Sequence, residues 1–352
     1  MFKKNRKSLV GLDVGSSSVK AVELQGKPGS LTLVNLAVEN LSTDAIVDGQ
    51  IMELNDVSTA ISNIFATHSI RTDRVAAGVG GSSVIVKNII VPQMSEAELE
   101  ESIEWHAEEH IPFDVADVAL DYQIVGSSPD ALQVLMAACK RDRVANLKQA
   151  IQLAGKQPMV IDVDAFALQN CYEVNYEPQA ADVVALLNIG ASTTNINIVQ
   201  GTQSVFTRDV SVGGNAYSIV LQKEFGLTFE QAEATKRTGM LPEHMQNQDI
   251  ALVMEPVSEM LAHEIGKTFD FYRATADDGM NASVGKILVS GGGSKVRGLS
   301  EYLAERFEIT VEVFNPFRKI KVDERRFDPD LVRDYVPEMA IAVGLALRGV
   351  EA

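Results

Sequence analysis

One short sequence motif occurs twice in this chain, and the two copies lie about half a chain length apart. Residues 9–18 read Leu-Val-Gly-Leu-Asp-Val-Gly-Ser-Ser-Ser, and residues 184–194 read Val-Ala-Leu-Leu-Asn-Ile-Gly-Ala-Ser-Thr-Thr. When Asp13 is aligned with Asn188, the preceding leucines and the following glycines superpose. In both copies an apolar run precedes a glycine turn rich in hydroxyl groups, and an alternating run follows, which predicts strand, tight turn and strand. The repeat therefore favours two homologous lobes that each begin with a hairpin.

The composition excludes several classes of protein. Apolar residues make up 46% of the 352 and charged residues 22%, which is typical of a globular protein. The length suits two domains, or one fold with two lobes. The formal net charge of −17 would repel phosphate groups, so we expect no nucleic-acid partner. A basic cluster at Lys3, Lys4, Arg6 and Lys7 is the exception, and we interpret it as a solvated chain end.

The hydropathy pattern gives no indication of direct membrane insertion. No stretch approaches 18 uninterrupted apolar residues, and no apolar region follows the N-terminal charges, so we predict neither a membrane span nor a signal peptide. We therefore expect a cytoplasmic protein that reaches a membrane only through a partner.

Between the two copies of the repeat, the pattern predicts a block of mixed structure. The expected strands are Val75–Val79, Val84–Val91, Val118–Val125 and Leu132–Ala138. A helix should begin after Ser95, which forms a capping box with Glu98, and should end near His110, because the proline two residues later disfavours a further turn. A second helix at 142–154 completes a βαββα-like block over residues 78–157.

The second half of the chain is predicted to be largely helical. The expected long helices are Gly214–Phe225, Phe229–Arg237 and Asp249–Ala276. The strand Lys286–Ser290 leads into three glycines and a helix at 299–307. The charged segment 317–336 should be rich in loops, and Pro337 should start a closing helix of small residues.

The first hairpin carries the groups that a phosphate site needs. In Asp13-Val-Gly-Ser-Ser-Ser-Val-Lys20, a turn of one glycine and three serines lets backbone N–H groups and hydroxyls converge on a phosphate. Asp13 ends the preceding strand and could hold a hydrated Mg²⁺, which prefers carboxylate and water oxygens. Taken alone, this pattern is equally typical of a structural turn.

Three further segments strengthen the hypothesis of a nucleotide site. The second hairpin would approach the same phosphates from the opposite lobe. Gly291-Gly292-Gly293-Ser294 follows an apolar strand and precedes a helix, so the backbone can come close to a flat or anionic ligand there. Glu233 and Lys236 lie three residues apart on one predicted helix, where they could hold ribose and adenine or form a solvated ion pair.

The order of these segments resembles that of the superfamily of actin, sugar kinases and Hsp70 chaperones. In the terms of that superfamily the order is phosphate 1 at 13–20, connect 1 near 162–167, phosphate 2 at 188–195, adenosine at 288–298 and connect 2 at 337–347. The resemblance implies an α/β, actin-like (ribonuclease-H-like) two-lobed fold that clamps ATP and Mg²⁺, with Asp13 reaching the Mg²⁺ through water. The nucleotide-binding residues that it implies are Asp13, Gly15, Ser16, Ser17, Ser18, Lys20, Asn188, Gly190, Ala191, Ser192, Thr193, Asn195, Glu233, Lys236, Gly291, Gly292, Gly293 and Lys295. It leaves the catalytic residue open, with Asp162 and Asp164 as candidates for a base.

The block at 78–157 falls where the bacterial division protein FtsA carries its interaction subdomain. The sequences of residues 104–113, 161–168 and 189–198 resemble those of the PilM family of type IV pilus assembly proteins. The resemblance covers essentially the whole chain. It implies a cytoplasmic ATP-binding scaffold of the inner-membrane pilus assembly complex. The scaffold would bind the cytoplasmic N-terminal segment of PilN in a groove between the first lobe and the insert. Other inner-membrane platform proteins and a motor ATPase stay open as further partners.

The resemblance also implies domain boundaries. The first core lobe would comprise 1–77, 158–182 and 337–352, and the inserted interaction subdomain 78–157. The second core lobe would comprise 183–225 and 270–336, and a small helical subdomain 226–269.

The chain departs from the superfamily pattern at one position, where Asn188 replaces the usual aspartate of phosphate 2. Asparagine cannot ionise or accept a proton, so we expect nucleotide binding with weak or no ATPase activity. Two other interpretations stay open: a phosphotransferase of the same fold, and a filament-forming cytoskeletal protein related to FtsA. The first needs a carboxylate base in the cleft, and the second would be expected to carry a terminal amphipathic helix.

Overall fold

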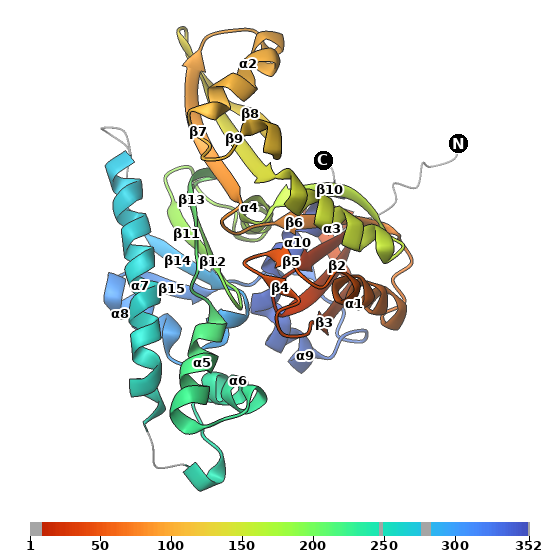
Figure 1. Ribbon diagram of the computed structural model, residues 1–352, viewed down its shortest axis with the longest axis vertical. Coiled ribbons are helices and arrows are strands. Elements are labelled where there is room, and N and C mark those ends of the chain that lie inside the picture. The colour runs from red at the N-terminus through yellow and green to blue at the C-terminus, as the bar shows by residue number, and fades with distance from the viewer. Residues whose placement is uncertain (1–8, 246–248, 276–282, 351–352) are drawn as a thin grey trace.

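The computed structural model describes residues 9–245, 249–275 and 283–350 (Figure 1). The basic cluster at residues 3–7 therefore lies outside the described residues. The first hairpin forms as predicted, because β1 (Val10–Val14) pairs antiparallel with β2 (Ser18–Lys27). Its sheet has the strand order β10-β6-β1-β2-β3-β16 in the described residues. The other strands of this sheet are β3 (Ser30–Asn40), β6 (Arg74–Val79), β10 (Gln157–Val163) and β16 (Ile320–Lys321).

The second hairpin also forms as predicted, and its sheet repeats the topology of the first. β11 (Val183–Ile189) pairs antiparallel with β12 (Thr194–Gln200), in a sheet of order β13-β12-β11-β14-β15. The remaining strands are β13 (Gln203–Val210), β14 (Lys286–Ser290) and β15 (Thr310–Val313). In both sheets the hairpin's first strand also pairs in parallel with a later strand, and its second strand pairs antiparallel with the next. The whole lobe is therefore repeated, and not only the hairpin.

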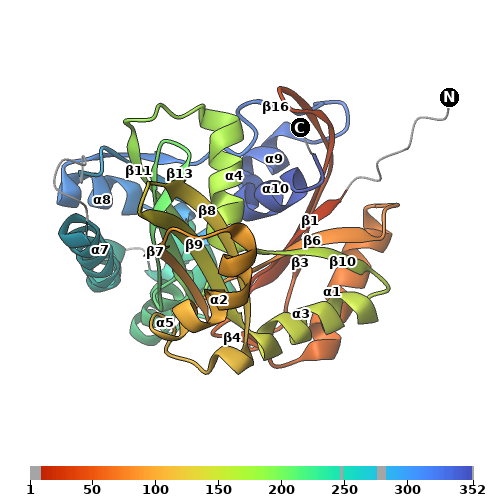
Figure 2. The same ribbon diagram turned by 90° about the horizontal axis from the view of Figure 1, so that it is seen from above.

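Two helices connect the lobes. α4 (Asp164–Tyr176) and α10 (Ala340–Leu347) lie between the two sheets in Figures 1 and 2. Their buried apolar residues join one core with β2 of the first sheet and with β11 and β14 of the second. α10 follows the predicted Pro337 by way of a short 3₁₀ turn, η4 (Val336–Met339). Because both sheets pack on the same two helices, the site residues at their ends are held in one structure.

Outer helices cover the remaining faces of the sheets. In the first lobe, α1 (Leu54–Thr67) packs on the sheet beside the short hairpin of β4 (Ile46–Val47) and β5 (Gln50–Ile51). In the second lobe, the covering helices are α5 (Gly214–Phe225), α6 (Phe229–Thr238), α7 (Ile250–Thr275) and α8 (Leu299–Phe307). The buried residues of these four helices share one core with the five-stranded sheet. Buried residues of α7 belong to this same core, and the expected small helical subdomain 226–269 stays a prediction.

The insert projects from the first lobe at the top of Figure 1. It contains a three-stranded antiparallel sheet of order β7-β9-β8, formed by β7 (Val84–Pro92), β9 (Ala131–Lys140) and β8 (Val118–Ser127). α2 (Glu96–Glu108) packs on this sheet, and the short turn η1 (Val115–Asp117) precedes β8. The predicted capping box is present, since the Ser95 hydroxyl accepts from the backbone N–H of Glu98, and the Glu98 carboxylate accepts in return.

The boundary of the insert differs from the prediction at its C-terminal side. We expected the helix at 142–154 to belong to the insert, but α3 (Arg141–Leu153) packs in the first lobe. Its buried Leu147, Ala150 and Ile151 join the same core as Val10 and Leu12. The apolar face of α3 is therefore matched by α1 and the first sheet, a match that the helical periodicity alone could not identify.

A second difference concerns the segment 317–336, which we predicted to be loop-rich within the second lobe. The structure forms β16 there, which pairs with β3 of the first sheet, and the short helix α9 (Pro329–Tyr335). Phe314, Phe317, Ile320 and Val332 are buried in the core that surrounds α10. These apolar residues are spaced too irregularly among charged ones to show as a periodic pattern in the sequence.

None of the helices in the described part of the chain has the length and apolar character that a membrane span needs.

Candidate functional site

The two hairpin turns have the same hydrogen-bond geometry. In the first, the N–H of Gly15 donates to the carbonyl of Ser18 at 3.1 Å, and in the second the N–H of Gly190 donates to the carbonyl of Thr193 at 2.9 Å. The N–H groups of the two residues after each glycine donate to no other described residue. Each turn thus presents free backbone donors, the arrangement that favours an anion.

Asp13 and Lys20 face each other across the first hairpin. They are register partners in β1 and β2, and the Lys20 Nζ atom lies 3.3 Å from the Asp13 Oδ2 atom. Both side chains are largely buried, at 15% and 11% exposure. A methyl group built on Gly15 would lie 3.6 Å from the Lys20 ammonium, so this ammonium stands at the turn. A cation is therefore held beside the free N–H groups of the first turn.

A row of polar residues crosses the second sheet at the corresponding level. Ser290, Asn188, Asn195 and Asp209 are successive register partners on β14, β11, β12 and β13. Ser290 donates its hydroxyl to the Asn188 Oδ1 atom at 3.4 Å, and Asn195 donates its amide to the Asp209 Oδ1 atom at 2.6 Å. The carboxylate of this row is that of Asp209, whereas Asn188 contributes an amide.

Asp164 connects the two lobes electrostatically. It is the first residue of α4, and a methyl group on Gly78 or Gly80 would lie only 2.0 or 2.4 Å from its carboxylate oxygens. The two glycines therefore allow the backbone after β6 to wrap around this carboxyl. Burial raises its pKa well above the usual range, and the charges of Asp13 and Asp209 raise it further. Residues from both lobes thus surround the start of α4.

Asp162, the other candidate base, lies at the end of β10. Its carboxylate is 3.3 Å from the Arg348 Nε atom and accepts a hydrogen bond from the backbone of Val163. Burial raises the pKa of this carboxyl, while Arg348 and the Val163 N–H oppose the shift. Asp162 is therefore engaged with Arg348, whereas Asp164 is influenced by carboxylates of both lobes.

The predicted adenosine loop packs tightly against the second hairpin. A methyl group on Gly291 would meet the Ile189 carbonyl at 2.4 Å, and one on Gly293 would meet the Ile189 side chain at 2.3 Å. Gly291 also has a φ of +83°, which disfavours any other residue. Its N–H donates to the Pro337 carbonyl at 2.7 Å, which ties the loop to η4. The structure therefore requires these glycines for close backbone packing.

The start of α5 adds a contact that the sequence did not indicate. The N–H of Gly214 donates to the Gly190 carbonyl at 2.9 Å, and that of Asn215 donates to the Ala191 carbonyl at 2.8 Å. A methyl group on Gly214 would lie 3.7 Å from the Cα atom of Gly293. The second turn, the start of α5 and the glycine loop therefore meet at one place.

Glu233 and Lys236 form an ion pair in the protein interior, and not on a solvated face. The Lys236 Nζ atom lies 2.5 Å from the Glu233 Oε1 atom and also donates to the Ser218 hydroxyl and the Gly214 carbonyl. Burial lowers the pKa of Lys236, and Glu233 opposes that shift. The ammonium thus helps to anchor α6 to the start of α5, and Glu233 remains the more accessible member of the pair.

Lys295 is held by carboxylates of the closing segment. Its Nζ atom lies 2.7 Å from Glu338 and 3.2 Å from Asp334. The side chain is 12% exposed. The pair with Glu338 fixes the glycine loop to η4, in addition to the bond between Gly291 and Pro337. A role of Lys295 toward a base or ribose stays a prediction.

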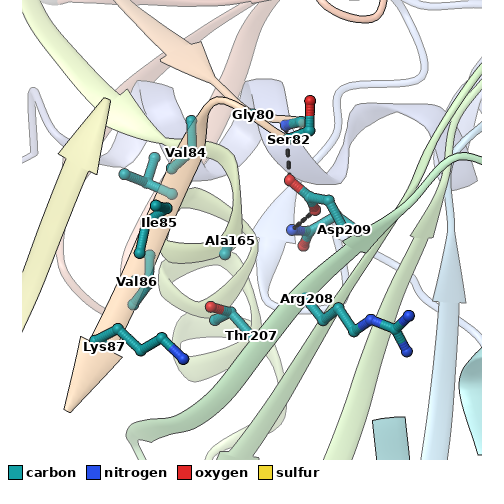
Figure 3. Close-up of a pocket in the computed structure, with 13 residues that line it drawn as sticks. Gly80, Ser82, Val84, Ile85, Val86, Lys87, Ala165, Thr207, Arg208 and Asp209 are labelled. Atoms are coloured by element: carbon teal, nitrogen blue, oxygen red, sulfur yellow. Dashed lines mark hydrogen bonds between the residues drawn. The ribbon is translucent and has the colours of Figure 1, made fainter. Parts of the chain in front are cut away.

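A separate cavity lies where the first lobe, the insert and the second lobe meet (Figure 3). Its volume is about 250 Å³. One wall is β7 with Val84, Ile85, Val86 and Lys87, and the facing wall is β13 with Thr207, Arg208 and Asp209. The loop at Gly80–Ser82 closes one end, and Ala165 of α4 lies at the base.

Asp209 lies between this cavity and the second hairpin. Its Oδ2 atom accepts the N–H of Gly81 at 2.7 Å, and its Oδ1 atom accepts the Asn195 amide, as the dashed lines in Figure 3 show. Burial raises the pKa of Asp209, and these two hydrogen bonds oppose the shift. Asp209 was not predicted as a site residue from the sequence. A regular hairpin closed by Gln200 and Gln203 would pair Asn195 with Arg208, and the register shift between Ile198 and Val199 places Asp209 there instead.

Comparisons with known proteins identify the family. The family model described as "Type IV pilus assembly protein PilM" matches residues 11–350. The chain belongs to the PilM family. A solved structure titled "PilM-PilN type IV pilus biogenesis complex" has a TM-score of 0.87 and 29% identity to this chain, and the match covers 99% of this chain and 100% of that one. The family resemblance inferred from the sequence is thereby confirmed.

More distant structures share the fold of this PilM family member. The ethanolamine utilization protein EutJ from Carboxydothermus hydrogenoformans has a TM-score of 0.57 at 16% identity, with 97% of this chain and 89% of that chain covered. MreB5 of Spiroplasma citri bound to AMPPNP has a TM-score of 0.54 at 14% identity, with 96% and 94% covered. At such identities these matches show the fold alone, and they confirm the predicted actin-like, two-lobed architecture.

Proposed function

We propose that this PilM family member is an ATP-binding scaffold of a type IV pilus assembly complex, and that it holds the cytoplasmic N-terminal segment of a PilN-like membrane protein. The observation that carries the proposal is the match to the PilM-PilN complex over almost the entire chain. The partner would hold the protein at the inner face of the inner membrane.

The residues of the two hairpins are suited to bind a nucleoside triphosphate with magnesium. Free N–H groups in both turns provide anion donors, and the Lys20 ammonium stands beside the first of them. Among the described residues, no three Asp, Glu, His or Cys side chains gather closely enough to hold a metal ion. Asp13 would therefore hold Mg²⁺ through water, with phosphate oxygens completing its coordination, as this ion prefers. The bound ion would neutralise phosphate charge.

Slow turnover is part of the proposal. Asn188 occupies the place in the polar row where a carboxylate would face the phosphates, and its amide accepts from Ser290 instead. An amide cannot take a proton from an attacking water. Asp164 is the remaining candidate base, and burial and the neighbouring carboxylates raise its pKa, which disfavours its ionised form.

The cavity between β7 and β13 is the proposed docking site of the partner segment. Both strands lie at the edges of their sheets, so their outer backbone groups are not paired in a ladder in the described residues. An extended segment could bond to such an edge and bury apolar side chains against Val84, Ile85 and Val86. Lys87 on the same wall would favour a segment that carries an acidic group.

The partner assignment is tested with a labelled synthetic peptide of the PilN-like N-terminal segment, by fluorescence anisotropy on the full chain. We expect saturable binding that a scrambled peptide does not show. Val86→Glu should weaken binding at least tenfold, about 1.4 kcal/mol, because it places a charge in the apolar wall.

Ile90→Glu on the same strand is the matched control, because Ile90 is 74% exposed and does not line the cavity. Equal loss in both variants would reject the groove. Equal binding of the scrambled and native peptides would reject the partner assignment.

The nucleotide assignment is tested by the affinity for Mg-ATP and by single-turnover hydrolysis. We expect binding that weakens at least tenfold in Asp13→Ala, together with hydrolysis far slower than release. Rapid hydrolysis that survives Asn188→Ala would contradict the proposed slow turnover.

A further inference from the structure

The loop at 80–83 lies next to several parts of the molecule that the proposed function uses. It joins β6, which pairs with β1 of the first hairpin, to β7, which forms one wall of the cavity. Gly80 packs against the Asp164 carboxylate, and the N–H of Gly81 bonds to Asp209 of the second lobe. The loop is therefore joined to the first hairpin through β6, and it contacts the start of α4, the groove and the second lobe.

Two hydrogen bonds join the segment 81–88 to β13 in the described residues, one at each end of the cavity. At one end Gly81 donates to Asp209 at 2.7 Å, and at the other the Asn88 amide donates to the Ser204 carbonyl at 3.5 Å. The cavity-lining residues 84–87 and 207–209 lie between these two bonds. No ladder joins the two strands in the described part of the chain. A movement of the second lobe would therefore change the width of the groove.

Asp209 is the residue that joins this groove to the second hairpin. One carboxylate oxygen accepts from Gly81 at the groove, and the other accepts from Asn195, which is the register partner of Asn188. Hydrogen bonds to an ionised acceptor are about twice as strong as neutral ones. A single side chain thus fixes the second lobe's polar row and the loop of the insert relative to each other.

We infer that the nucleotide and the partner segment bind with coupled affinities, and that the bridge from Gly81 through Asp209 to Asn195 carries the coupling. A nucleotide held by both hairpins fixes the relative position of the lobes, and so keeps β13 in place as the second wall of the groove. The segment then binds a wall that is already positioned. This inference rests on the proposed function and adds its regulation.

The test measures the Kd of the labelled PilN-like peptide on the full chain, with and without saturating Mg-AMPPNP, in wild type and in Asp209→Ala. Couplings between sites typically change affinity 5- to 150-fold. We expect the nucleotide to tighten peptide binding at least about fivefold in wild type and by less than twofold in Asp209→Ala. The ratio of the two Kd values is the readout, because Asp209 also lines the groove and its loss alone changes affinity.

Glu312→Ala provides the control, since Glu312 forms an exposed pair with Lys286 on the far edge strand β15. This variant should keep the wild-type ratio. Asp209→Asn serves if the alanine variant does not fold, because its NH2 group would face one of the two donors in place of an acceptor oxygen, and it should also reduce the ratio.

The outcomes separate this inference from the function on which it rests. Failure of wild type to bind the peptide or the nucleotide would reject the proposed function. Binding of both with an unchanged peptide Kd would reject the coupling, as would a peptide Kd that weakens with nucleotide. A wild-type ratio retained in the Asp209 variants would reject the bridge.

Discussion

The carboxylate of Asp164, at the centre of this molecule, lowers the stability of the fold. A role in binding explains its presence better than a role in stability does. Asp164 is enclosed by the backbone of Gly78 and Gly80, and no hydrogen bond to its carboxylate occurs in the described residues. Its position at the start of α4 favours a negative charge, by roughly 0.3–1 kcal/mol at most helix ends. Burial and the nearby carboxylates of Asp13 and Asp209 outweigh this benefit, because the pKa is raised and not lowered.

We predict that Asp164→Asn stabilises the protein in the absence of nucleotide at neutral pH. A carboxyl whose folded pKa is raised binds more protons when folded, so its contribution is fully favourable below about pH 4, the unfolded pKa. That contribution is lost as the pH rises through the folded pKa. The amide removes this loss, so the unfolding free energy from urea titrations should depend less steeply on pH above about 4.

Asp330→Asn is the control, since Asp330 lies in the first turn of α9 and its side chain is 84% exposed. It should change stability by less than about 0.5 kcal/mol at any pH. Destabilisation by Asp164→Asn at pH 7 would contradict the inference that burial and neighbouring carboxylates destabilise the ionised Asp164.

At the scale of elements, α10 shows how closely two helices must approach to join the lobes. A methyl group on Gly344 would lie 1.8 Å from the Ala167 carbonyl oxygen of α4, and one on Gly11 would lie 2.0 Å from the Ala342 carbonyl of α10. The contacted atoms are backbone atoms, which cannot move aside alone. Gly11 and Gly344 are therefore required for the packing of α10 against β1 and α4.

Gly344→Ala should destabilise the protein by about 3 kcal/mol or more, because overpacking against backbone separates α10 from α4. Urea unfolding followed by circular dichroism measures this change. The matched control is Gly266→Ala in the middle of α7, where the nearest atom is 3.7 Å away. It should stabilise by roughly 0.5–1 kcal/mol, since alanine favours a helix. Similar effects at both glycines would show that helix propensity and not packing decides.

At the scale of the whole molecule, the two lobes share a core through α4 and α10 and are also bridged by Gly81 and Asp209. A ligand that contacts both hairpins would add a third connection. Such a ligand binds only the folded chain, because each turn forms in its own sheet and both sheets must pack on the connecting helices.

We therefore expect Mg-ATP to raise the unfolding free energy by about 2.7 kcal/mol at a hundredfold excess over its Kd. Differential scanning fluorimetry against nucleotide concentration measures the effect. Lys20→Gln should abolish most of the shift, because it removes the cation beside the first turn. Lys286→Gln, which breaks only an exposed pair, should retain it. A shift of equal size in both variants would place the nucleotide elsewhere.

The sequence alone determined the features that depend on residues close together in the chain. The hairpins at β1–β2 and β11–β12, the capping box of α2 and the glycine loop at 291–293 follow from turn chemistry and short-range periodicity. The repeated motif even indicated that the lobes are homologous, because each copy had to begin an equivalent sheet.

Only the tertiary structure decided which surfaces these elements share. The apolar face of α3 fits the first lobe and not the insert, Lys236 is buried although its helix spacing is equally typical of a surface pair, and Asp209 meets Gly81 across 128 positions of sequence. Periodicity states that a face is buried but not what buries it. Partners distant in the chain are selected by shape and by the need to satisfy buried polar groups, and these exist only once the lobes have packed.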